Sequence, residues 1–363
     1  MRWADFLIPI AAFLSGWIAT RLAIPWLKRQ GVLDVPNHRS SHHVPTPRGG
    51  GIGIVVGFSV GITIALMVGR PLPGWEFYAG CGLVALTGVI DDRRGLPVTA
   101  RLLIQLVAAA LIIGGTGGID RLPLPVPLDL PLGPAAIPVA LIWIVGVINL
   151  YNFLDGIDGF AALQGMLAGI CLAVFANGSA MAATGLALAG ACGGFLVFNW
   201  HPAKVFMGDI GSGVLGFTLA ALPFQLETNS RVDAIFVVSI CLWFFLSDGV
   251  FTILRRASRG ERVWHAHRSH LYQRLVMTGL RHDRVVLYVL SAAAILAGLA
   301  IISIRSGSMN AKWSVMLLAS ASFATYYWWT LRRERTSGLK TRLITAAQTS
   351  SEQLYQGVDH RLT

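Results

Sequence analysis

Residues 135–177 read AAIPVALIWIVGVINLYNFLDGIDGFAALQGMLAGICLAVFAN. Two apolar runs in this stretch, 135–151 and 160–177, each have the roughly 17 to 25 residues that a membrane crossing needs, and a short polar stretch separates them. The rest of the chain has the same character, because 54% of its 363 residues are hydrophobic and only 13% are charged. A soluble domain carries about 25% charged residues. The composition therefore indicates an integral membrane protein.

The apolar runs of this kind are 5–27, 49–69, 74–90, 100–118, 135–151, 160–177, 180–199, 210–226, 233–254, 285–304 and 311–331. They predict an all-α integral membrane protein, a polytopic bundle of about 11 (10–11) transmembrane helices. We expect residues 1–332 to form one polytopic catalytic domain and 333–363 a polar cytoplasmic tail. The first run is long and lacks a small-residue cleavage site, so it is predicted to be a crossing and not a signal peptide.

Basic residues indicate the orientation, since lysine and arginine collect in cytoplasmic loops. Most of the 29 lysines and arginines lie in the loops after odd-numbered runs or in the C-terminal tail. The N-terminus is therefore predicted outside, and the loops after odd-numbered runs in the cytoplasm. These loops explain the net charge of +11, which requires no nucleic acid.

Five polar stretches hold nearly all the acidic, histidine and asparagine chemistry, and each follows an odd-numbered run. They are 36–51 (PNHRSSHHVPTPRGGG), 88–94 (GVIDDRR), 149–159 (NLYNFLDGIDG), 198–212 (FNWHPAKVFMGDIGS) and 255–274 (RRASRGERVWHAHRSHLYQR). A membrane chain changes sides with each crossing, so loops of equal parity share one face. We therefore expect these stretches to converge in one site at the inner surface.

The third run ends in Asp91 and Asp92. Adjacent carboxylates at a membrane interface are costly unless a cation or hydrogen-bond donors hold them. Mg²⁺ suits such oxygen ligands, because it is usually bound by one or two carboxylates plus substrate phosphates. The alternative is a solvated pair that Arg93 and Arg94 neutralise.

Asn149, Asn152, Asp155 and Asp158 follow one another at three-residue spacing. This spacing places them along one side of a helix, where four oxygen-bearing groups can line a polar cavity. Helix capping accounts for one or two such residues, but not for four in register. The stretch is therefore a strong candidate for binding a polar substrate.

Asp209 lies in the glycine-rich sequence FMGDIGS at the start of the eighth run, five residues after Lys204. A glycine-rich turn at a helix start with a nearby lysine suits phosphate and metal-phosphate binding. A simple N-cap is the alternative interpretation.

Basic side chains complete the set. His265, His267 and His270 lie in one basic loop, and Arg48 lies in the first polar stretch beside three glycines. Cysteine is absent from both loops, so contact with phosphate is favoured over metal ligation by these histidines. Solvated cytoplasmic loops of the same composition are the alternative. Carboxylates for a divalent cation and cations for phosphates, all at one membrane surface, indicate phosphoryl transfer to or from a lipid.

These five motifs, in this order, resemble the polyprenyl-phosphate N-acetylhexosamine-1-phosphate transferases, which form glycosyltransferase family 4. The resemblance covers about residues 34–275, and RSSHHVPTPRGGG is most similar to the O-antigen-initiating branch. The last loop reads HAHRSH and lacks the compact triple histidine of the muramoyl-pentapeptide branch.

The resemblance implies a bacterial inner-membrane enzyme with its active site on the cytoplasmic face. Its donor would be a UDP-N-acetylhexosamine of the GlcNAc, GalNAc, QuiNAc or FucNAc type, and its acceptor undecaprenyl phosphate. The products would be UMP and undecaprenyl-diphospho-sugar, in the first membrane step of O-antigen or another envelope polysaccharide. The cofactor would be Mg²⁺, with Mn²⁺ as a substitute, and the enzyme is expected to form a homodimer.

The same resemblance implies roles for individual residues. Asp91, Asp92 and His267 would be catalytic, and Asp209 and Asp91 would hold the metal. The residues expected to bind substrate are Asn149, Asn152, Asp155, Asp158, Asn199, Lys204, Phe206, His270 and Arg48, with Asp158 near the uracil and Phe206 stacking on the uridine.

Two mechanisms and two other functions remain open at this stage. The lipid phosphate attacks the β-phosphorus directly, or an aspartyl-phosphate intermediate forms first. A cation-coupled transporter would also carry carboxylates, but near the membrane midplane and in repeated halves, and no repeat is found here. A lipid-binding scaffold without activity does not explain four separate acidic motifs.

The convergence of the loops can be tested by topology mapping. A reporter inserted in 88–94 and another in 198–212 are expected to lie on the same, cytoplasmic side, because these stretches are separated by an even number of predicted crossings. Reporters found on opposite sides of the membrane would contradict the shared site.

Overall fold

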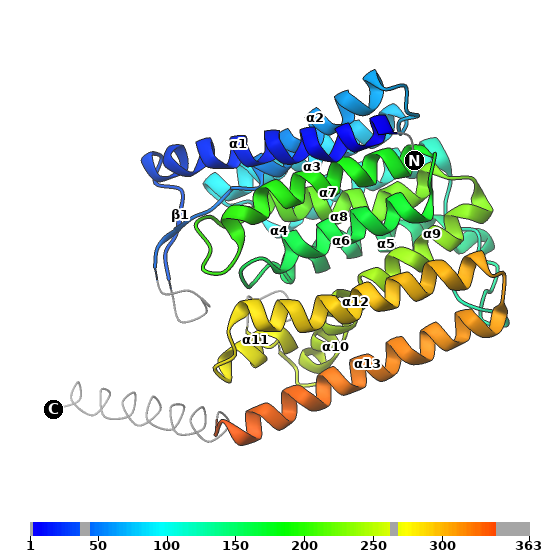
Figure 1. Ribbon diagram of the computed structural model, residues 1–363. Coiled ribbons are helices and arrows are strands. Elements are labelled where there is room, and N and C mark those ends of the chain that lie inside the picture. The colour runs from blue at the N-terminus through cyan, green and yellow to red at the C-terminus, as the bar shows by residue number, and fades with distance from the viewer. Residues whose placement is uncertain (1–2, 37–43, 262–267, 339–363) are drawn as a thin grey trace.

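The computed structural model describes residues 3–36, 44–261 and 268–338. Its elements are η1 (Trp3–Phe6), α1 (Leu7–Arg29), β1 (Leu33–Asp34), β2 (Thr46–Pro47), α2 (Ile52–Met67), α3 (Trp75–Arg94), α4 (Val98–Thr116), η2 (Gly133–Ala135), α5 (Ala136–Phe153), α6 (Phe160–Phe175), α7 (Ala180–Asn199), α8 (Gly208–Ala221), η3 (Leu222–Gln225), α9 (Thr228–Cys241), α10 (Trp243–Ala257), α11 (Leu271–Met277), α12 (His282–Arg305) and α13 (Met309–Thr336). The helices form a layered bundle, with α1 and α2 at one side and α13 at the other (Figure 1).

The all-α membrane prediction is confirmed. Five helices in the described residues are long and apolar enough to cross a membrane, or six if a bent pair counts as one crossing. The bent pair is α9 and α10, which meet at an angle of 73° and replace the continuous helix expected over 233–254. The count of eleven crossings and the orientation stay predictions.

Small residues let the helices of the N-terminal half pack closely. A Cβ on Gly57 of α2 would lie 2.6 Å from the carbonyl oxygen of Ala12 in α1, and one on Gly194 of α7 would collide with the carbonyl oxygen of Phe13. Helices in lipid gain no hydrophobic driving force from one another, so close van der Waals packing at such residues holds them together. The result is a rigid support for the polar loops.

The end of the loop before α2, residues 47–51, lies against the N-terminal turn of α8. β1 and β2 pair antiparallel, and beyond them Arg48 bridges to Phe206. The amide groups of Gly50 and Gly51 donate to the carbonyl oxygens of Phe206 (2.9 Å) and Met207 (2.8 Å). These backbone bonds fix Arg48 beside the turn that begins α8. In Figure 1, β1 and α11 lie at the same end of the bundle, opposite the N-terminus.

Candidate active site

Asp92 caps a helix that belongs to a different part of the sequence. Its two carboxylate oxygens accept hydrogen bonds from the amides of Asp209 (2.9 Å) and Ile210 (3.2 Å) at the start of α8. The first amides of a helix lack intrahelical acceptors and attract anions. Gly208 has φ +74°, and a Cβ there would lie 2.5 Å from Asp92 Oδ2, so this turn requires glycine. The contact fixes Asp209 in place.

Arg48 joins the two carboxylates. Its Nε lies 3.0 Å from Asp92 Oδ1, and its Nη2 pairs with Asp209 Oδ2. Burial alone would lower the pKa of Arg48, but the charges of Asp209 and Asp92 outweigh burial and raise it. The guanidinium is therefore a permanent positive charge between the ends of α3 and α8.

The asparagines of the third polar stretch reach the same centre from α5. Asn152 donates to Asp209 Oδ1 (2.8 Å) and accepts from the hydroxyl of Ser212 (2.8 Å). One turn earlier, Asn149 donates to Gln105 Oε1 of α4 (2.6 Å). The three-residue spacing thus gives one residue in contact with Asp209 and another that lines the adjoining pocket.

Asp155 brings a further carboxylate to this cluster. Burial raises the pKa of Asp155 to about 7; Arg48 acts in the opposite direction, and Asp209 and Asp92 add to the increase. Within the described residues, Asp92, Asp155 and Asp209 thus place three carboxylates around one guanidinium. The excess negative charge and the oxygen-only donors fit a divalent cation such as Mg²⁺.

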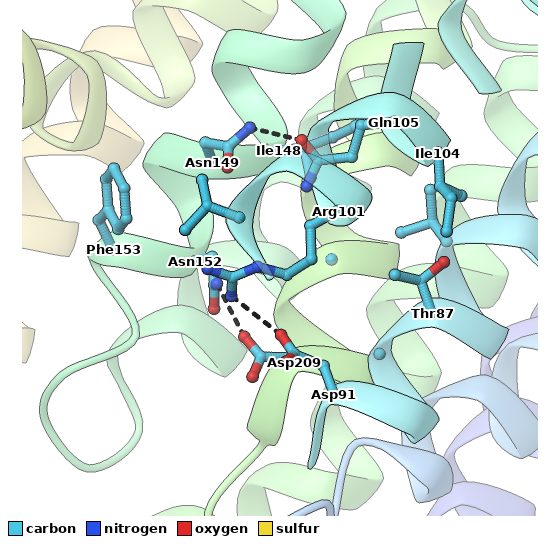
Figure 2. A pocket seen from close by; sticks show the side chains of 14 residues that line it. Thr87, Asp91, Arg101, Ile104, Gln105, Ile148, Asn149, Asn152, Phe153 and Asp209 are labelled. Carbon is cyan, nitrogen blue, oxygen red and sulfur yellow. Dashed lines mark hydrogen bonds and ion pairs between the residues drawn. The ribbon is translucent and has the colours of Figure 1, made fainter. Parts of the chain in front are cut away.

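Asp91 faces away from Asp92 into a small pocket. It pairs with Arg101 of α4 (2.9 Å), and its other oxygen accepts from the amide of Leu96 (2.6 Å). The pocket has a volume of 70 Å³ and lies between α3, α4, α5 and α8. Figure 2 shows Asp91 and Asp209 at one end of it, with Asn149 and Gln105 at the other. Asp91 and Asp92 are adjacent in the sequence but therefore contact different groups.

Arg101 and Gln105 were missed by the sequence reasoning. Both lie in the first two turns of α4, on a helix that is otherwise apolar and reads as an ordinary crossing. A charged group inside a predicted crossing is expensive and is by default a functional candidate. That signal was present in the sequence and could have identified Arg101.

A larger cleft opens on the other side of the α1–α2 loop. It has a volume of 750 Å³ and is lined by the basic side chains of Arg21, Lys28 and Lys204, by the ring of Phe206 and by Asp158. Burial alone would raise the pKa of Asp158, but hydrogen bonds from His282 and His201 outweigh burial and lower it. The cleft therefore combines cations, an aromatic ring and an ionised carboxylate.

Comparison with known proteins identifies the family. Residues 75–227 match glycosyl transferase family 4. The "Decaprenyl-phosphate N-acetylglucosaminephosphotransferase" of Mycolicibacterium smegmatis is 31% identical over 325 residues, covering 79% of this chain and 78% of the relative. The chain belongs to glycosyl transferase family 4.

Other relatives agree with this assignment. The "Probable undecaprenyl-phosphate N-acetylglucosaminyl 1-phosphate transferase" of Bacillus subtilis is 30% identical over 289 residues, covering 77% of this chain and 80% of the relative. The "Undecaprenyl-phosphate alpha-N-acetylglucosaminyl 1-phosphate transferase" of Yersinia pestis is 27% identical over 341 residues, covering 87% of each chain. The family predicted from the five motifs is therefore confirmed, and the protein is a multi-pass membrane protein.

Two of the residues expected to act on substrate have other surroundings in this family 4 chain, and a third is not described. The side chain of Asn199 is buried, accepts from the amide of Gly159 (3.0 Å) and donates to the carbonyl oxygen of Val205 (2.9 Å). His270 is buried at the start of α11 and lines neither of the two pockets described above. His267 lies outside the described residues. Asn199 thus ties two polar loops together, and the predicted substrate contacts of all three residues stay predictions.

Asp248 and Tyr272 hold the loop of Asp155 and Asp158 in position through α11. Neither residue was predicted from the sequence. Asp248 of α10 accepts from the amide of Leu271 (2.9 Å) and so begins α11. Tyr272 of α11 then donates its hydroxyl to the carbonyl oxygen of Phe153 (3.2 Å). A Cβ on Gly156 would collide with this hydroxyl, which explains the glycine. The bend between α9 and α10 thereby helps to hold the loop of Asp155 and Asp158.

The raised pKa of Asp155 predicts a pH-dependent stability. The value of about 7 exceeds the ordinary 3.8, so the folded chain binds this proton more tightly than the unfolded chain does. Stability should therefore fall as the pH rises from about 4 to about 7. Asp155→Asn removes the penalty and should raise the melting temperature in EDTA at about pH 8 by roughly 2–4 °C or more, with no gain at about pH 4.

Asp158→Asn is the matched control, because the pKa of Asp158 is lowered and its ionised form is favoured in the folded chain. It should lower the melting temperature at high pH, opposite in sign to Asp155→Asn. Equal effects of the two variants at both pH values would contradict the charge excess in the cluster.

Proposed function

We propose that the chain transfers an N-acetylhexosamine 1-phosphate from a UDP-sugar to undecaprenyl phosphate, with release of UMP. The observation that carries this proposal is the position of the Asp92, Arg48 and Asp209 cluster. Asp209 lines the smaller pocket, and Arg48 bridges through its backbone to Phe206, which lines the larger cleft. The names of the relatives supply the class of acceptor and the transfer of a sugar phosphate.

The acceptor phosphate would enter the smaller pocket. Its wall is α4, whose outer face exposes Leu102, Leu103 and Val107, while its inner face carries Arg101. A polyprenyl chain can remain in lipid along such an apolar face as its phosphate reaches the guanidinium. A side chain of this kind binds phosphate through charge-assisted hydrogen bonds. Arg101 is thus the acceptor-binding residue in this proposal.

The donor would occupy the larger cleft. Lys28 and Lys204 supply positive charge for its diphosphate, and Phe206 supplies a ring on which a base can stack. The ionised carboxylate of Asp158 can accept a hydrogen bond from the N3–H of uracil. Because Phe206 and Asp158 lie three residues from Asp209 and Asp155, the diphosphate would extend toward the carboxylate cluster.

The metal would be Mg²⁺, with Mn²⁺ as a substitute, held by Asp209 and Asp91, which line the same pocket. When bound, such an ion supplies charge neutralisation at the diphosphate oxygens. Asp92 keeps Asp209 in position through the amides of α8, and Arg48 stabilises negative charge that develops at the leaving phosphate. Asn152 orients the Asp209 carboxylate.

Direct attack by the lipid phosphate on the β-phosphorus is the mechanism that we favour. A phosphate monoester has its second pKa near about 6 and is mostly ionised at neutral pH, so it needs no strong base. Asp91, which pairs with Arg101, would accept the remaining proton. The carboxylates of Asp92 and Asp209 are both engaged by donors, which suits positioning better than formation of an aspartyl phosphate.

The biological setting extends the proposal. We place the enzyme in the bacterial inner membrane with its site on the cytoplasmic face, at the first membrane step of O-antigen or another envelope polysaccharide. GlcNAc, GalNAc, QuiNAc and FucNAc are the donor sugars to compare, and a homodimer is the proposed assembly. A panel of these UDP-sugars with purified protein and undecaprenyl phosphate would identify the donor.

Asp209→Asn is the central test of the reaction. The wild-type protein should move radiolabelled sugar phosphate from the UDP-sugar into the lipid fraction, and added UMP should reverse the labelling. The variant should lose at least about 100-fold in rate, as other enzymes do when one charge-stabilising group is removed, while its melting temperature shows that it still folds. Full activity of the variant would overturn the assigned role of Asp209, and no lipid labelling by the wild type with any donor would overturn the reaction.

The two pockets predict a separation of kinetic effects. Arg101→Gln should raise KM for undecaprenyl phosphate by about 10–100-fold, since a charged hydrogen bond contributes about 1.5–3 kcal/mol, and should leave KM for the UDP-sugar nearly unchanged. Phe206→Ala should show the opposite pattern. The control is Arg121→Gln, because the exposed side chain of Arg121 pairs with Asp129 outside both pockets. Parallel changes in both KM values for Arg101→Gln would contradict separate sites.

A further inference from the structure

Asp158, His201 and His282 meet in the wall of the larger cleft, although they come from three different segments. Asp158 lies in the loop between α5 and α6, His201 lies in the loop before α8, and His282 is the first residue of α12. Their nearest nitrogen and oxygen atoms all lie within 4.8 Å of one another. Asp158 and His282 are buried, whereas the side chain of His201 is 26% exposed.

The carboxylate of Asp158 is the contact that the two histidines share. Asp158 Oδ2 lies 2.6 Å from His201 Nδ1 and 3.3 Å from His282 Nδ1. The backbone amide of Asp158 also donates to His282 Nδ1, at 3.3 Å. The two imidazole Nδ1 atoms therefore approach the same carboxylate oxygen from different segments of the chain.

A proton on each Nδ1 atom lets both imidazoles donate to the carboxylate, so that the group forms a hydrogen-bonded network. A divalent metal ion can take the place of these protons, because a neutral imidazole nitrogen and a carboxylate oxygen are both metal ligands. The three donor atoms lie within 4.8 Å of one another, which is near the separation of ligands that share one ion.

The donor atoms define the class of metal. Two imidazole nitrogens and one carboxylate oxygen form the ligand set of Zn²⁺ sites that keep a fourth position open. Imidazole suits zinc and its neighbours in the first transition row, whereas Mg²⁺ prefers oxygen ligands alone. The carboxylate cluster of Asp92, Asp155 and Asp209 offers only oxygen atoms as metal ligands, so the two groups differ in the ions that they select.

We propose that Asp158, His201 and His282 bind a divalent transition metal of the Zn²⁺ class, at a site separate from the carboxylate cluster. The partly exposed His201 and the adjoining 750 Å³ cleft leave room for water or an anionic oxygen at the fourth position. Binding would tie α12 to the two polar loops that carry Asp155 and Asp209. The site itself does not depend on the proposed reaction.

The test uses the purified full-length protein, stripped with EDTA and titrated with Zn²⁺ in excess Mg²⁺ against a chromophoric chelator. The wild type should bind one equivalent that depends on both histidines, gain thermal stability on binding, and show tetrahedral absorption bands with Co²⁺. His201→Ala and His282→Ala should each weaken binding at least about tenfold, since even outer-shell partners contribute that much. His201→Cys supplies another zinc ligand and should retain the metal.

Matched controls separate this site from the others. Asp209→Asn should bind the same equivalent unchanged, as should His265→Ala and His267→Ala in the histidine-rich stretch 265–270. If His282→Ala does not fold, the pair His201→Ala and His201→Cys decides the question. A wild type that binds no zinc, an equivalent that survives both histidine substitutions, or one that is lost in Asp209→Asn would overturn the proposal. None of these measurements requires transferase activity.

Discussion

The hydrogen bonds from the start of α8 to the carboxylate of Asp92 are the contact on which the site depends. Two backbone amides of one helix are capped by a side chain from another, more than a hundred residues earlier in the chain. Each charge-assisted bond contributes about 1.5–3 kcal/mol, and here the pair also fixes the direction of Asp209. Arg48 is then held between two carboxylates whose separation is already set.

Negative charges outnumber positive charges in this centre, because three carboxylates surround one guanidinium. Burial of this excess negative charge is unfavourable by itself. Burial of Asp155 and, to a smaller extent, the charges of Asp209 and Asp92 raise its pKa to about 7, which is the direction that this cost predicts. The transfer proposed here would bring two phosphorylated substrates together, and preorganised charges of this kind stabilise the charge that develops in such a reaction.

A second group of contacts holds the polar loops from the side of α11. Asp248 begins that short helix, and Tyr272 in turn bonds the end of α5. Asn199 joins the loop after α5 to the loop before α8. Asn199 and Tyr272 lie in the polar stretches 198–212 and 255–274, but their spacing does not indicate these contacts. The contacts arise because the packed helices bring distant backbone groups into hydrogen-bond distance.

The sequence by itself determined the class of fold, the family and the stretches that form the site. Hydrophobicity and motif order are local properties, which is why Asp92, Asn152 and Asp209 could be selected before any contact was known. Tertiary structure decided what each side chain does: Asp91 faces Arg101 while its neighbour Asp92 caps α8, and Asp158 meets two histidines that no spacing rule connects. The physical reason is that the direction of a side chain and its distance from other groups depend on how the helices pack. The sequence shows only that a residue is aspartate, and not whether its carboxylate caps a helix, pairs with arginine or binds a metal.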